Sequence, residues 1–460
     1  MLATSQKNSF TIYKFVPMVE AFSRPSSLQL PALSSYNGEV RVPGSKSITN
    51  RVFLISALAR GTTKLHNLLR SDDTRYMGEA LKELGIKIEM SDDYTEATVV
   101  GNGGPMDAPE NVDGDYVADL YLGNAGTAMR SLCAALTLGK GEFHLSGEQR
   151  MKERPIRDLV DALGSLGADI TYMETVGFPP VCIRSNGLKS GSVSVRGNIS
   201  SQYLTALLIC APYAIGEEGS ELHIHVEGQL ISAPYILLTL DVMKHFGIEV
   251  RHDGLTDFYV PKGVYVSPGD YMVEGDASSA SYPLAAAAIA KGKCRVLGVG
   301  SECRQGDVAF VEVLKKMGAK ITMGPDWVEC EGAPLHACDM NLNDIPDAAM
   351  TVAVLALFAD GPMTISGIAS WRVKETDRIA AMAAELRKVG AQVVETNDSI
   401  TVTPPAKLNE NVAIETYNDH RMAMCFSLVA LGGVPVKIMD QACVNKTYPK
   451  YFEDFKKLAK

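Results

Sequence analysis

The stretch VPGSKSITNRVFLISALARGTTKLHNL, residues 42–68, contains the unit that decides the fold. It opens with a Pro-Gly turn, continues through hydroxyl and cationic side chains into the apolar run VFLISALA, and ends with Gly61 and a short strand-like segment. A turn that leads directly into a helix leaves backbone N–H groups without partners at the electropositive helix end. Lys46 and Arg51 beside this end predict an anion site. On this stretch alone, an ordinary N-cap with two solvated charges fits equally well.

The same unit occurs six times, starting about every 70 to 80 residues. The other copies begin at residues 121, 195, 273, 342 and 417, and each has a polar turn, a small-residue apolar helix, a glycine and a strand. A second, amphipathic helix follows in each unit, and the sixth is shortened to YFEDFKKLAK. The first helix is apolar on nearly all sides and is predicted to be buried, whereas the second covers the outside. The pattern predicts a layered α/β fold in which three units close one domain.

Repetition also predicts the direction of the inner helices. Within each domain their N-termini point the same way, so two facing domains bring six positive helix ends to one cleft. Each end contributes only about 0.3 to 1 kcal/mol toward an anion. Lys and Arg side chains, at roughly 1.5 to 3 kcal/mol per charge-assisted bond, must therefore supply most of the binding of a multiply charged ligand.

Composition limits the classes of protein that fit. A chain of 460 residues is expected to form two or three domains. The net charge of −10 argues against a nucleic-acid surface. Nine scattered cysteines without a C-x-x-C pair indicate reduced thiols of a cytosolic protein rather than disulfides or a zinc site. Apolar stretches stay shorter than the ~18 residues of a membrane span. The Ser/Pro-rich first 35 residues are expected to be a partly disordered extension, with a transit-peptide remnant as the alternative.

Polar turns in the second and third units repeat the arrangement. GNAGT, residues 123–127, predicts a backbone nest for an anion. Arg150 lies in the cluster RMKER, where a solvated face is the simpler interpretation, although its position next to the nest favours function. ISSQY, residues 199–203, offers uncharged donors, but a plain helix cap has the same pattern.

The C-terminal half places carboxylates among cations. WRVKETDR is expected to place Lys374 and Arg378 on one helical face beside Glu375, with a surface ion-pair network as the alternative. Asp347 begins a buried helix, where simple N-capping is equally possible. Carboxylates in such a pocket can move protons once water is excluded. His223 and His225 share a strand face without a third ligand nearby, so a metal there is not expected.

Nine long motifs, in order, resemble those of the 5-enolpyruvylshikimate-3-phosphate (EPSP) synthase family of enolpyruvyl transferases. They are PGSKSITNR, LGNAGTAMR, RMKERPI, SSQYLTALL, EGDASSASY, IPDAAMT, WRVKETDR, NDHRMAMCFSL and KTYPKYF. The resemblance implies a two-domain α/β fold in which three βαβαββ repeats with buried inner helices form an inside-out α/β barrel in each domain. It divides the chain into residues 45–273 with repeats one to three and residues 274–460 with repeats four to six. Residues 1–44, the N-terminal extension and first crossover, join the second domain.

The resemblance also implies the reaction. The 5-hydroxyl of shikimate-3-phosphate attacks C2 of phosphoenolpyruvate while C3 takes a proton, and the tetrahedral intermediate then loses phosphate and a C3 proton, a step of chorismate and aromatic amino-acid biosynthesis. Asp347 is expected to act as base, with Glu375 and Lys46 as proton carriers. No metal or cofactor is expected, because Lys and Arg side chains neutralise both substrates. The expected partners are these small molecules alone, without nucleic acid or membrane, bound by a cytoplasmic monomer.

The binding residues are carried over from the motifs in two sets. The shikimate-3-phosphate set is Lys46, Ser47, Arg51, Ser200, Ser201, Gln202, Ser232, Tyr235, Asp347 and Lys374. The phosphoenolpyruvate set is Lys46, Gly126, Arg150, Gln202, Arg378, Arg421 and Lys446.

Three positions depart from the family pattern. Ser131 stands where Pro is usual, on the helix that carries Gly126, and we expect it to weaken binding of glyphosate, the herbicide that occupies the phosphoenolpyruvate pocket. Gln149 replaces a common Pro without a predicted effect. Ser370 replaces a frequent Asn and is expected to keep only one of two hydrogen bonds to the substrate phosphate.

Two other functions compete with this one. The sister enzymes that transfer enolpyruvyl to UDP-N-acetylglucosamine usually carry a reactive cysteine in the second unit, where this chain reads GEQRMKERP. A non-catalytic anion-binding homologue is the other alternative. Intact Lys46, Asp347 and Glu375 argue against it.

Overall fold

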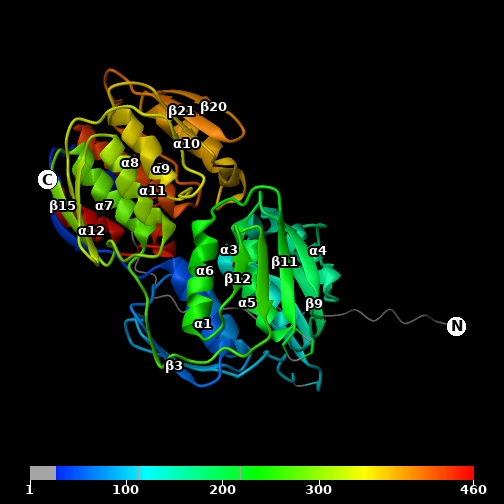
Figure 1. The fold of residues 1–460 in the computed structure, drawn as a ribbon. Coiled ribbons are helices and arrows are strands. Elements are labelled where there is room, and N and C mark those ends of the chain that lie inside the picture. The colour runs from blue at the N-terminus through cyan, green and yellow to red at the C-terminus, as the bar shows by residue number, and fades with distance from the viewer. Residues whose placement is uncertain (1–26, 112, 215, 218) are drawn as a thin grey trace.

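Two hydrophobic cores organise the chain in the computed structural model, which describes residues 27–111, 113–214, 216–217 and 219–460. One core draws its buried residues from Ile48 to Val273 and defines what we call the N-terminal lobe. The other combines Leu30–Val42 with Ala277–Ala459 and defines the C-terminal lobe. Figure 1 shows the C-terminal lobe above the N-terminal lobe. The two-lobed α/β architecture inferred from the repeats is confirmed.

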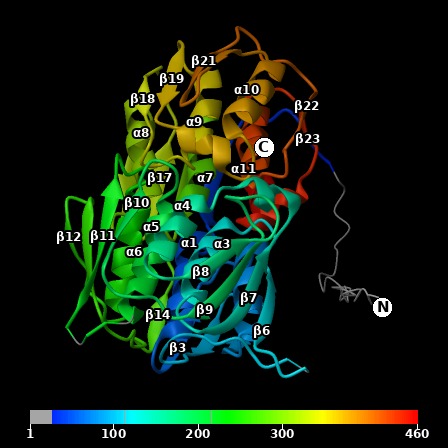
Figure 2. The ribbon, with the colours of Figure 1, turned by 90° about the vertical axis from the view of Figure 1, so that its right-hand side faces the viewer.

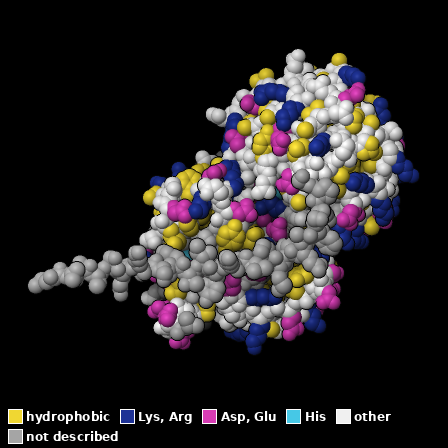
Figure 3. Space-filling view, turned by 180° about the vertical axis from the view of Figure 1, so that it is seen from behind, with side chains coloured by type: hydrophobic (Ala, Val, Ile, Leu, Met, Phe, Trp, Pro, Cys, Tyr) yellow, Lys and Arg dark blue, Asp and Glu magenta, His cyan; other side chains and the backbone are white. Residues whose placement is uncertain are grey.

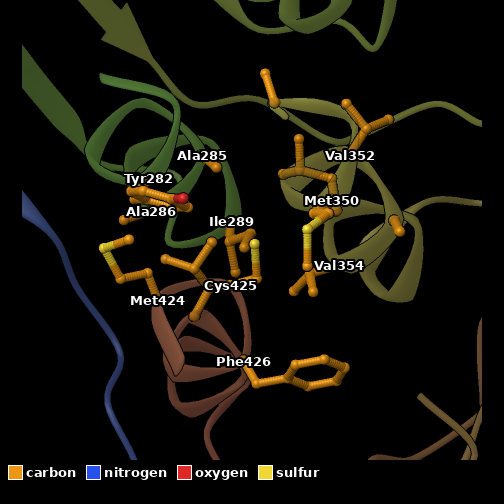
Figure 4. Packing of buried hydrophobic residues seen from close by; sticks show 14 of the residues in the cluster. Tyr282, Ala285, Ala286, Ile289, Met350, Val352, Val354, Met424, Cys425 and Phe426 are labelled. Carbon is orange, nitrogen blue, oxygen red and sulfur yellow. The ribbon is translucent and has the colours of Figure 1, made fainter. Parts of the chain in front are cut away.

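One inner helix per repeat is buried in the lobe cores. All residues of Ala277–Ile289 are buried, since Ala and Ser side chains let neighbouring helices approach closely. Figure 4 shows Ala286, Met350 and Phe426 of three different helices around one core. The inner helices are α1 (Lys46–Leu58), α3 (Gly126–Leu136) and α5 (Ser201–Cys210) in the N-terminal lobe, and α7 (Ala277–Ile289), α9 (Ala349–Leu355) and α11 (His420–Ser427) in the C-terminal lobe.

The second helix of each repeat lies outside. In the first repeat, Met77, Ala80 and Leu81 are buried while the charged residues of the opposite face are not, as the amphipathic pattern predicted. The outer helices are α2 (Asp72–Glu83), α4 (Arg157–Ser165), α6 (Pro234–His245), α8 (Phe310–Lys316), α10 (Arg378–Lys388) and α12 (Tyr451–Leu458).

Each repeat has one small sheet. In the four-stranded sheets, a parallel pair joins an antiparallel hairpin. The N-terminal lobe has β14-β3-β5-β4 (Asp270–Met272, Thr62–His66, Ala97–Val100, Lys87–Met90), β6-β7-β9-β8 (Val117–Tyr121, Lys140–Ser146, Val181–Asn186, Asp169–Tyr172) and β10-β11-β13-β12 (Ser192–Arg196, Glu221–Glu227, Asp257–Pro261, Arg251–Asp253). The C-terminal lobe has β16-β17-β15-β2 (Lys320–Met323, Trp327–Glu331, Lys293–Leu297, Asn37–Arg41), β18-β19-β21-β20 (Met340–Asn341, Met363–Ser366, Ser399–Thr403, Gln392–Glu395) and β1-β23-β22 (Leu28–Leu30, Val436–Ile438, Val412–Ile414).

Two strands come from distant parts of the chain. β2 pairs in parallel with β15 of the fourth repeat, and β14 pairs in parallel with β3 of the first. Between them, Gly44 and Gly275 form an isolated antiparallel bridge, so the chain crosses between the lobes twice at adjacent points.

The segment before β2 differs from the sequence-based expectation. Residues 1–26 of the expected extension lie outside the described residues. Leu28–Leu30 does not extend away from the fold: it forms β1, which pairs antiparallel with β23. The reason is packing, because Leu30 is buried in the C-terminal core and Leu28 packs against it. The Ser/Pro-rich composition around this strand hides its short apolar pattern.

The surface shows no segregation of charge on the face seen in Figure 3, where basic and acidic side chains are interspersed. Among the helices of the described residues, none has both the length and the apolar character needed to cross a membrane.

Candidate active site

A pocket lies between the lobes, at the N-terminal ends of inner helices from both. Lys46 and Ser47 open α1, Thr127 is in the first turn of α3, and Ser201 opens α5. Asp347, just before α9, lines the pocket from the other lobe. The pocket is lined by every member of the predicted shikimate-3-phosphate set: Lys46, Ser47, Arg51, Ser200, Ser201, Gln202, Ser232, Tyr235, Asp347 and Lys374.

The remaining two inner helices begin beside residues that line this pocket. Asp276 caps α7 and accepts a hydrogen bond from the Lys46 backbone N–H at 3.2 Å. Asp419 caps α11, and Arg421 in the first turn donates to Asp347 Oδ2 at 2.9 Å. All six helix N-termini therefore converge on one cleft, as the repeats predicted, and their partial positive charges favour an anion there.

Arg51 lines the pocket from the N-terminal lobe, and its side chain is held in place by four hydrogen bonds. Its guanidinium donates to Thr239 Oγ1 at 2.9 Å, Thr205 Oγ1 at 3.2 Å, the Ser47 carbonyl at 2.8 Å and the Tyr235 carbonyl at 3.3 Å. The side chain is nearly inaccessible, and burial lowers the pKa of Arg51 to about 10, so it stays a cation at neutral pH. The alternative of a solvated surface charge is wrong for Arg51.

Arg378 is the centre of a buried ion network in the C-terminal lobe. It donates to Asp419 Oδ2 at 2.7 Å, Asp347 Oδ1 at 2.9 Å and Glu375 Oε2 at 2.9 Å. Arg378 is 1% exposed, which excludes the surface ion-pair alternative. Three carboxylates around one guanidinium satisfy its donors in a fixed geometry.

The same network fixes the charge state of two candidate catalytic groups. Burial alone would raise the pKa of Asp347, but Arg421, Lys374 and other nearby cations outweigh burial and hold that pKa well below its usual range. The pKa of Glu375 is likewise raised by burial and lowered further by Arg378 and other cations, to well below normal. Both side chains are therefore carboxylates at neutral pH.

The relation of Lys374 to Arg378 corrects a sequence-based expectation. They do not lie on one helical face, because a 3-10 turn, η5 (Ala369–Val373), ends before Lys374 and α10 begins only at Arg378. Asp377 starts the helix there by accepting a hydrogen bond from Ala380 N–H. Lys374 has extended backbone angles, and its Nζ lies 3.6 Å from Asp347 Oδ1. Asp347 itself does not cap α9: it forms ion pairs instead.

Of the predicted phosphoenolpyruvate set, Lys46 and Gln202 line the pocket. The other members are not among its lining residues but contact residues that are, or share a partner with one: Gly126, Arg150, Arg378, Arg421 and Lys446. Lys446 Nζ lies 2.8 Å from Asp73 Oδ1 and donates to the Asn124 carbonyl at 2.9 Å, which joins the C-terminal lobe to the N-terminal lobe. Arg150, from the N-terminal lobe, forms a second link between the lobes by donating to the carbonyl of Lys374 in the C-terminal lobe at 3.0 Å. Lys46 Nζ lies 3.6 Å from Asp73 Oδ2, so lysines from both lobes meet at one carboxylate.

Gly126 is the predicted phosphoenolpyruvate residue without a side chain. A Cβ at this position would collide with the Arg154 guanidinium, so a larger residue here would have to displace that side chain. Arg154 is buried, lines the pocket and donates to both the carbonyl and the side-chain oxygen of Asn124 at 3.0 and 2.9 Å. Of the predicted departures, Ser131 is buried within α3, Gln149 opens the 3-10 turn η1 (Gln149–Glu153), and Ser370 lines the pocket.

Four residues of the site were missed by sequence reasoning. Arg154 was placed in a charge cluster, where Arg150 was favoured, and Asp73 lies in the first turn of an outer helix without any motif. Arg130 lines the pocket, and burial lowers its pKa to about 10. His420 is fully buried and neither ring nitrogen has a hydrogen-bond partner, while burial, Arg421 and Lys46 hold its pKa well below the usual range. Arg130 and His420 lie within the quoted motifs, at the helix turns that carry Gly126 and Arg421, and that position was the available signal.

Comparison with known proteins agrees with this geometry. Residues 32–455 match the sequence profile of a family described as EPSP synthase (3-phosphoshikimate 1-carboxyvinyltransferase). The 3-phosphoshikimate 1-carboxyvinyltransferase of Marinomonas sp. (strain MWYL1) is 57% identical over 94% of this chain and 100% of its own length. That of Aeromonas salmonicida (strain A449) is 56% identical over 93% and 98%.

A solved structure of EPSP synthase from Acinetobacter baumannii has a TM-score of 0.76 to this chain at 27% identity, covering 94% of this chain and 98% of that one. The enolpyruvyl transferase NikO from Streptomyces tendae, at 18% identity and a TM-score of 0.74, shares the fold. The chain belongs to the EPSP synthase family and transfers the enolpyruvyl group of phosphoenolpyruvate to the 5-hydroxyl of shikimate-3-phosphate.

Proposed function

We propose that Asp347, Glu375 and Lys46 move the protons of this transfer, and that the cations around them hold the two anionic substrates between the lobes. The observation that carries the proposal is the meeting of one buried carboxylate, Glu375, and one partly buried carboxylate, Asp347, with lysines and arginines from both lobes at one pocket. Preorganised cations stabilise the charge that develops on the tetrahedral intermediate and on the departing phosphate.

Asp347 is the proposed base for the 5-hydroxyl. Its carboxylate is ionised at neutral pH, and Arg378 and Arg421 hold its two oxygens in place. The substrates bring several negative charges to the same guanidiniums, which raises the proton affinity of Asp347 when both are bound. The carboxylate then takes the hydroxyl proton as the oxygen attacks C2 of phosphoenolpyruvate.

Lys46 and Glu375 are the proposed proton carriers at C3. The Lys46 ammonium donates a proton to C3 as the intermediate forms, and the Glu375 carboxylate removes a C3 proton when phosphate leaves. Both lie in the pocket lining. Positioned acid–base groups of this kind contribute about 10²- to 10⁴-fold to a rate, so cationic stabilisation and exclusion of water must contribute much of the remainder.

The two substrates are assigned to adjacent parts of the cleft. Arg51, Lys374 and the hydroxyl side chains of Ser200, Ser201 and Ser232 suit the carboxylate, hydroxyls and phosphate of shikimate-3-phosphate. The full shikimate-3-phosphate set remains the ten predicted residues named above, all of which line the pocket. Arg150, Arg378, Arg421 and Lys446, with Gly126, suit phosphoenolpyruvate, and Lys46 and Gln202 suit both.

The organisation of the molecule is part of the proposal. Residues 45–273 and 274–460 are the two domains, and of the predicted segment 1–44 the described residues 27–44 belong with the second. The protein acts as a cytoplasmic monomer: its cysteines fit a reducing compartment, and residues of both predicted substrate sets meet at the junction of the two lobes of a single chain. Light scattering of the purified protein tests the monomer, and a dimer mass contradicts it.

Phosphate release tests the chemistry. The protein is assayed with shikimate-3-phosphate and phosphoenolpyruvate, with UDP-N-acetylglucosamine as the alternative acceptor. Lys46→Ala and Asp347→Ala are each expected to lower turnover at least ~10²-fold, the lower end for lost acid–base help. Lys64→Ala and Asp344→Ala remove the same groups from exposed positions and serve as controls. A near-normal rate in Lys46→Ala or Asp347→Ala removes the role assigned to that residue.

A further inference from the structure

The outer face of the sheet β6-β7-β9-β8 carries an unusual row of side chains. In register, Asp119 lies opposite His144, His144 opposite Cys182, and Cys182 opposite Thr171. Figure 2 shows β6, β7 and β9 side by side on the outside of the N-terminal lobe. Because Phe143 and the other alternate residues point into the core, this row faces outward.

Three residues on this face bring potential metal ligands together. Glu142 precedes His144 by two positions on β7, so it lies on the same side of the sheet as His144 and Cys182. One ligand atom each from Glu142, His144 and Cys182 all lie within 4.8 Å of one another. The thiol is covered, since Cys182 is 5% exposed, while Glu142 and His144 are half-buried.

Neighbouring side chains orient two of these groups. His144 Nδ1 lies 2.7 Å from Asp119 Oδ1, and His144 Nε2 lies 2.9 Å from Glu142 Oε1. Arg184 Nε donates to Glu142 Oε2 at 2.8 Å. An imidazole whose Nδ1–H donates to a carboxylate presents the Nε2 lone pair, and this carboxylate–histidine arrangement commonly supports a bound metal.

We propose that Glu142, His144 and Cys182 bind one divalent transition-metal ion, zinc by preference, with water as the fourth ligand. A nitrogen, an oxygen and a sulfur donor at one point suit tetrahedral zinc better than magnesium or calcium, which require oxygen ligands. On binding, the Cys182 thiol gives its proton to solvent as the sulfur–metal bond forms. His144 contributes the Nε2 lone pair and keeps the proton on Nδ1.

The site ties β7 to β9 and is separate from enolpyruvyl transfer. Its ligands lie on the solvent face of the sheet, whereas the pocket lies at the helix N-termini. The metal is therefore expected to stabilise the N-terminal lobe. The spacing of these residues along the chain does not predict the site, because strand register alone brings Cys182 beside His144.

Cobalt is the probe for this site. The full chain, first treated with EDTA, is titrated with Co²⁺, and a thiolate-to-cobalt charge-transfer band that saturates at one equivalent is expected. Zn²⁺ should displace the cobalt and raise the thermal midpoint of the wild type. Cys182→Ser should abolish the band, and Glu142→Gln and His144→Gln should weaken binding at least tenfold. Asp119→Asn should weaken it by about 10- to 100-fold, the usual cost of losing an outer-shell partner.

His66→Gln is the matched control. His66 also lies between two carboxylates, 3.3 Å from Glu96 and 2.9 Å from Asp270, with comparable exposure of its side chain. It is not part of a group with a thiol among the described residues. This variant should bind cobalt like the wild type. Absence of the band in the wild type, its persistence in Cys182→Ser, or equal weakening by His66→Gln and His144→Gln overturns the proposal. The thermal midpoint of each metal-free variant shows that it is folded.

Discussion

At the scale of single residues, Asp73 links the two lobes through Lys46 and Lys446. Asp73→Asn removes the charge that holds both ammonium groups, and kcat/KM is expected to fall about tenfold or more, because a hydrogen bond to a charged group is worth about 1.5 to 3 kcal/mol. Asp72→Asn removes the same charge from the same helix turn at an exposed position and should have little effect. Equal kinetics in the two variants would show that the lysines do not depend on Asp73.

Ser131 tests the glyphosate hypothesis. It is buried in α3, five residues after Gly126, so its identity affects the helix that borders the phosphoenolpyruvate side of the cleft. Ser131→Pro is expected to strengthen inhibition by glyphosate relative to the wild type. The measurement is the inhibition constant against phosphoenolpyruvate. Unchanged or weaker inhibition of the variant contradicts the hypothesis.

The sequence reveals site residues when they share the turns that precede the apolar helices. Lys46, Arg51 and Asp347 were found in this way, because each repeat places its helix N-terminus at the cleft. Asp73 was not found, since it reaches the cleft from an outer helix whose first turn is acidic for ordinary helix-end reasons. Arg154 was overlooked because three cations in five residues do not show which one is buried.

At the scale of elements, close packing of the inner helices depends on small side chains. Ala286 of α7 is fully buried among α7, α9 and α11 (Figure 4). Ala286→Leu is expected to lower the free energy of unfolding by about 1 to 3 kcal/mol through overpacking. Ala380→Leu makes the same change at an exposed position of α10 and should be nearly neutral. Denaturant unfolding of both variants checks this, and a neutral Ala286→Leu would show that the core has unused space.

Element types were easier to predict than element ends. The period of the apolar residues identified the inner and outer helices, because burial on all sides and burial on one face leave different patterns. The start of α10 was misplaced, since a capping aspartate at Asp377 begins the helix after Lys374. β1 was missed because three residues, paired only with a strand near the C-terminus, leave no periodic signal.

At the scale of the whole molecule, Tyr235 and Asp307 connect the lobes by a hydrogen bond of 2.7 Å from the tyrosine hydroxyl to Asp307 Oδ2. Burial, followed by the charge of Asp347, raises the pKa of Asp307 from 3.8 to about 6. The folded state therefore favours protonated Asp307. The raised pKa of Asp307 contributes to the free energy of unfolding, and this stabilisation is fully present below the pKa of Asp in the unfolded chain and is lost as the pH rises through about 6.

Asp307→Asn isolates this titration. The wild type loses the stabilisation from protonated Asp307 between about pH 4 and about pH 7, whereas the variant D307N does not. The free energy of unfolding of the variant should therefore rise relative to that of the wild type by about 2 to 3 kcal/mol over this range, since each pKa unit corresponds to about 1.4 kcal/mol. Asp347 and Glu375 have pKa values well below their usual range, so both stay ionised in the folded state across this pH range, and the titration of the unfolded chain at these two positions is the same in both proteins. Urea unfolding across this range is the measurement, with Asp344→Asn as an exposed control. A constant difference contradicts the assignment.

The origin of β2 has a consequence for synthesis on the ribosome. Asn37 and its neighbour Lys293 in the finished sheet are 256 positions apart. At about 5 to 20 residues per second, the nascent strand waits roughly 13 to 50 seconds for its partner to be translated. The N-terminal lobe, whose last strand ends at Met272, is complete before then. Translation rate and chaperone occupancy during this interval therefore control how often the unpaired strand meets another polypeptide before its own.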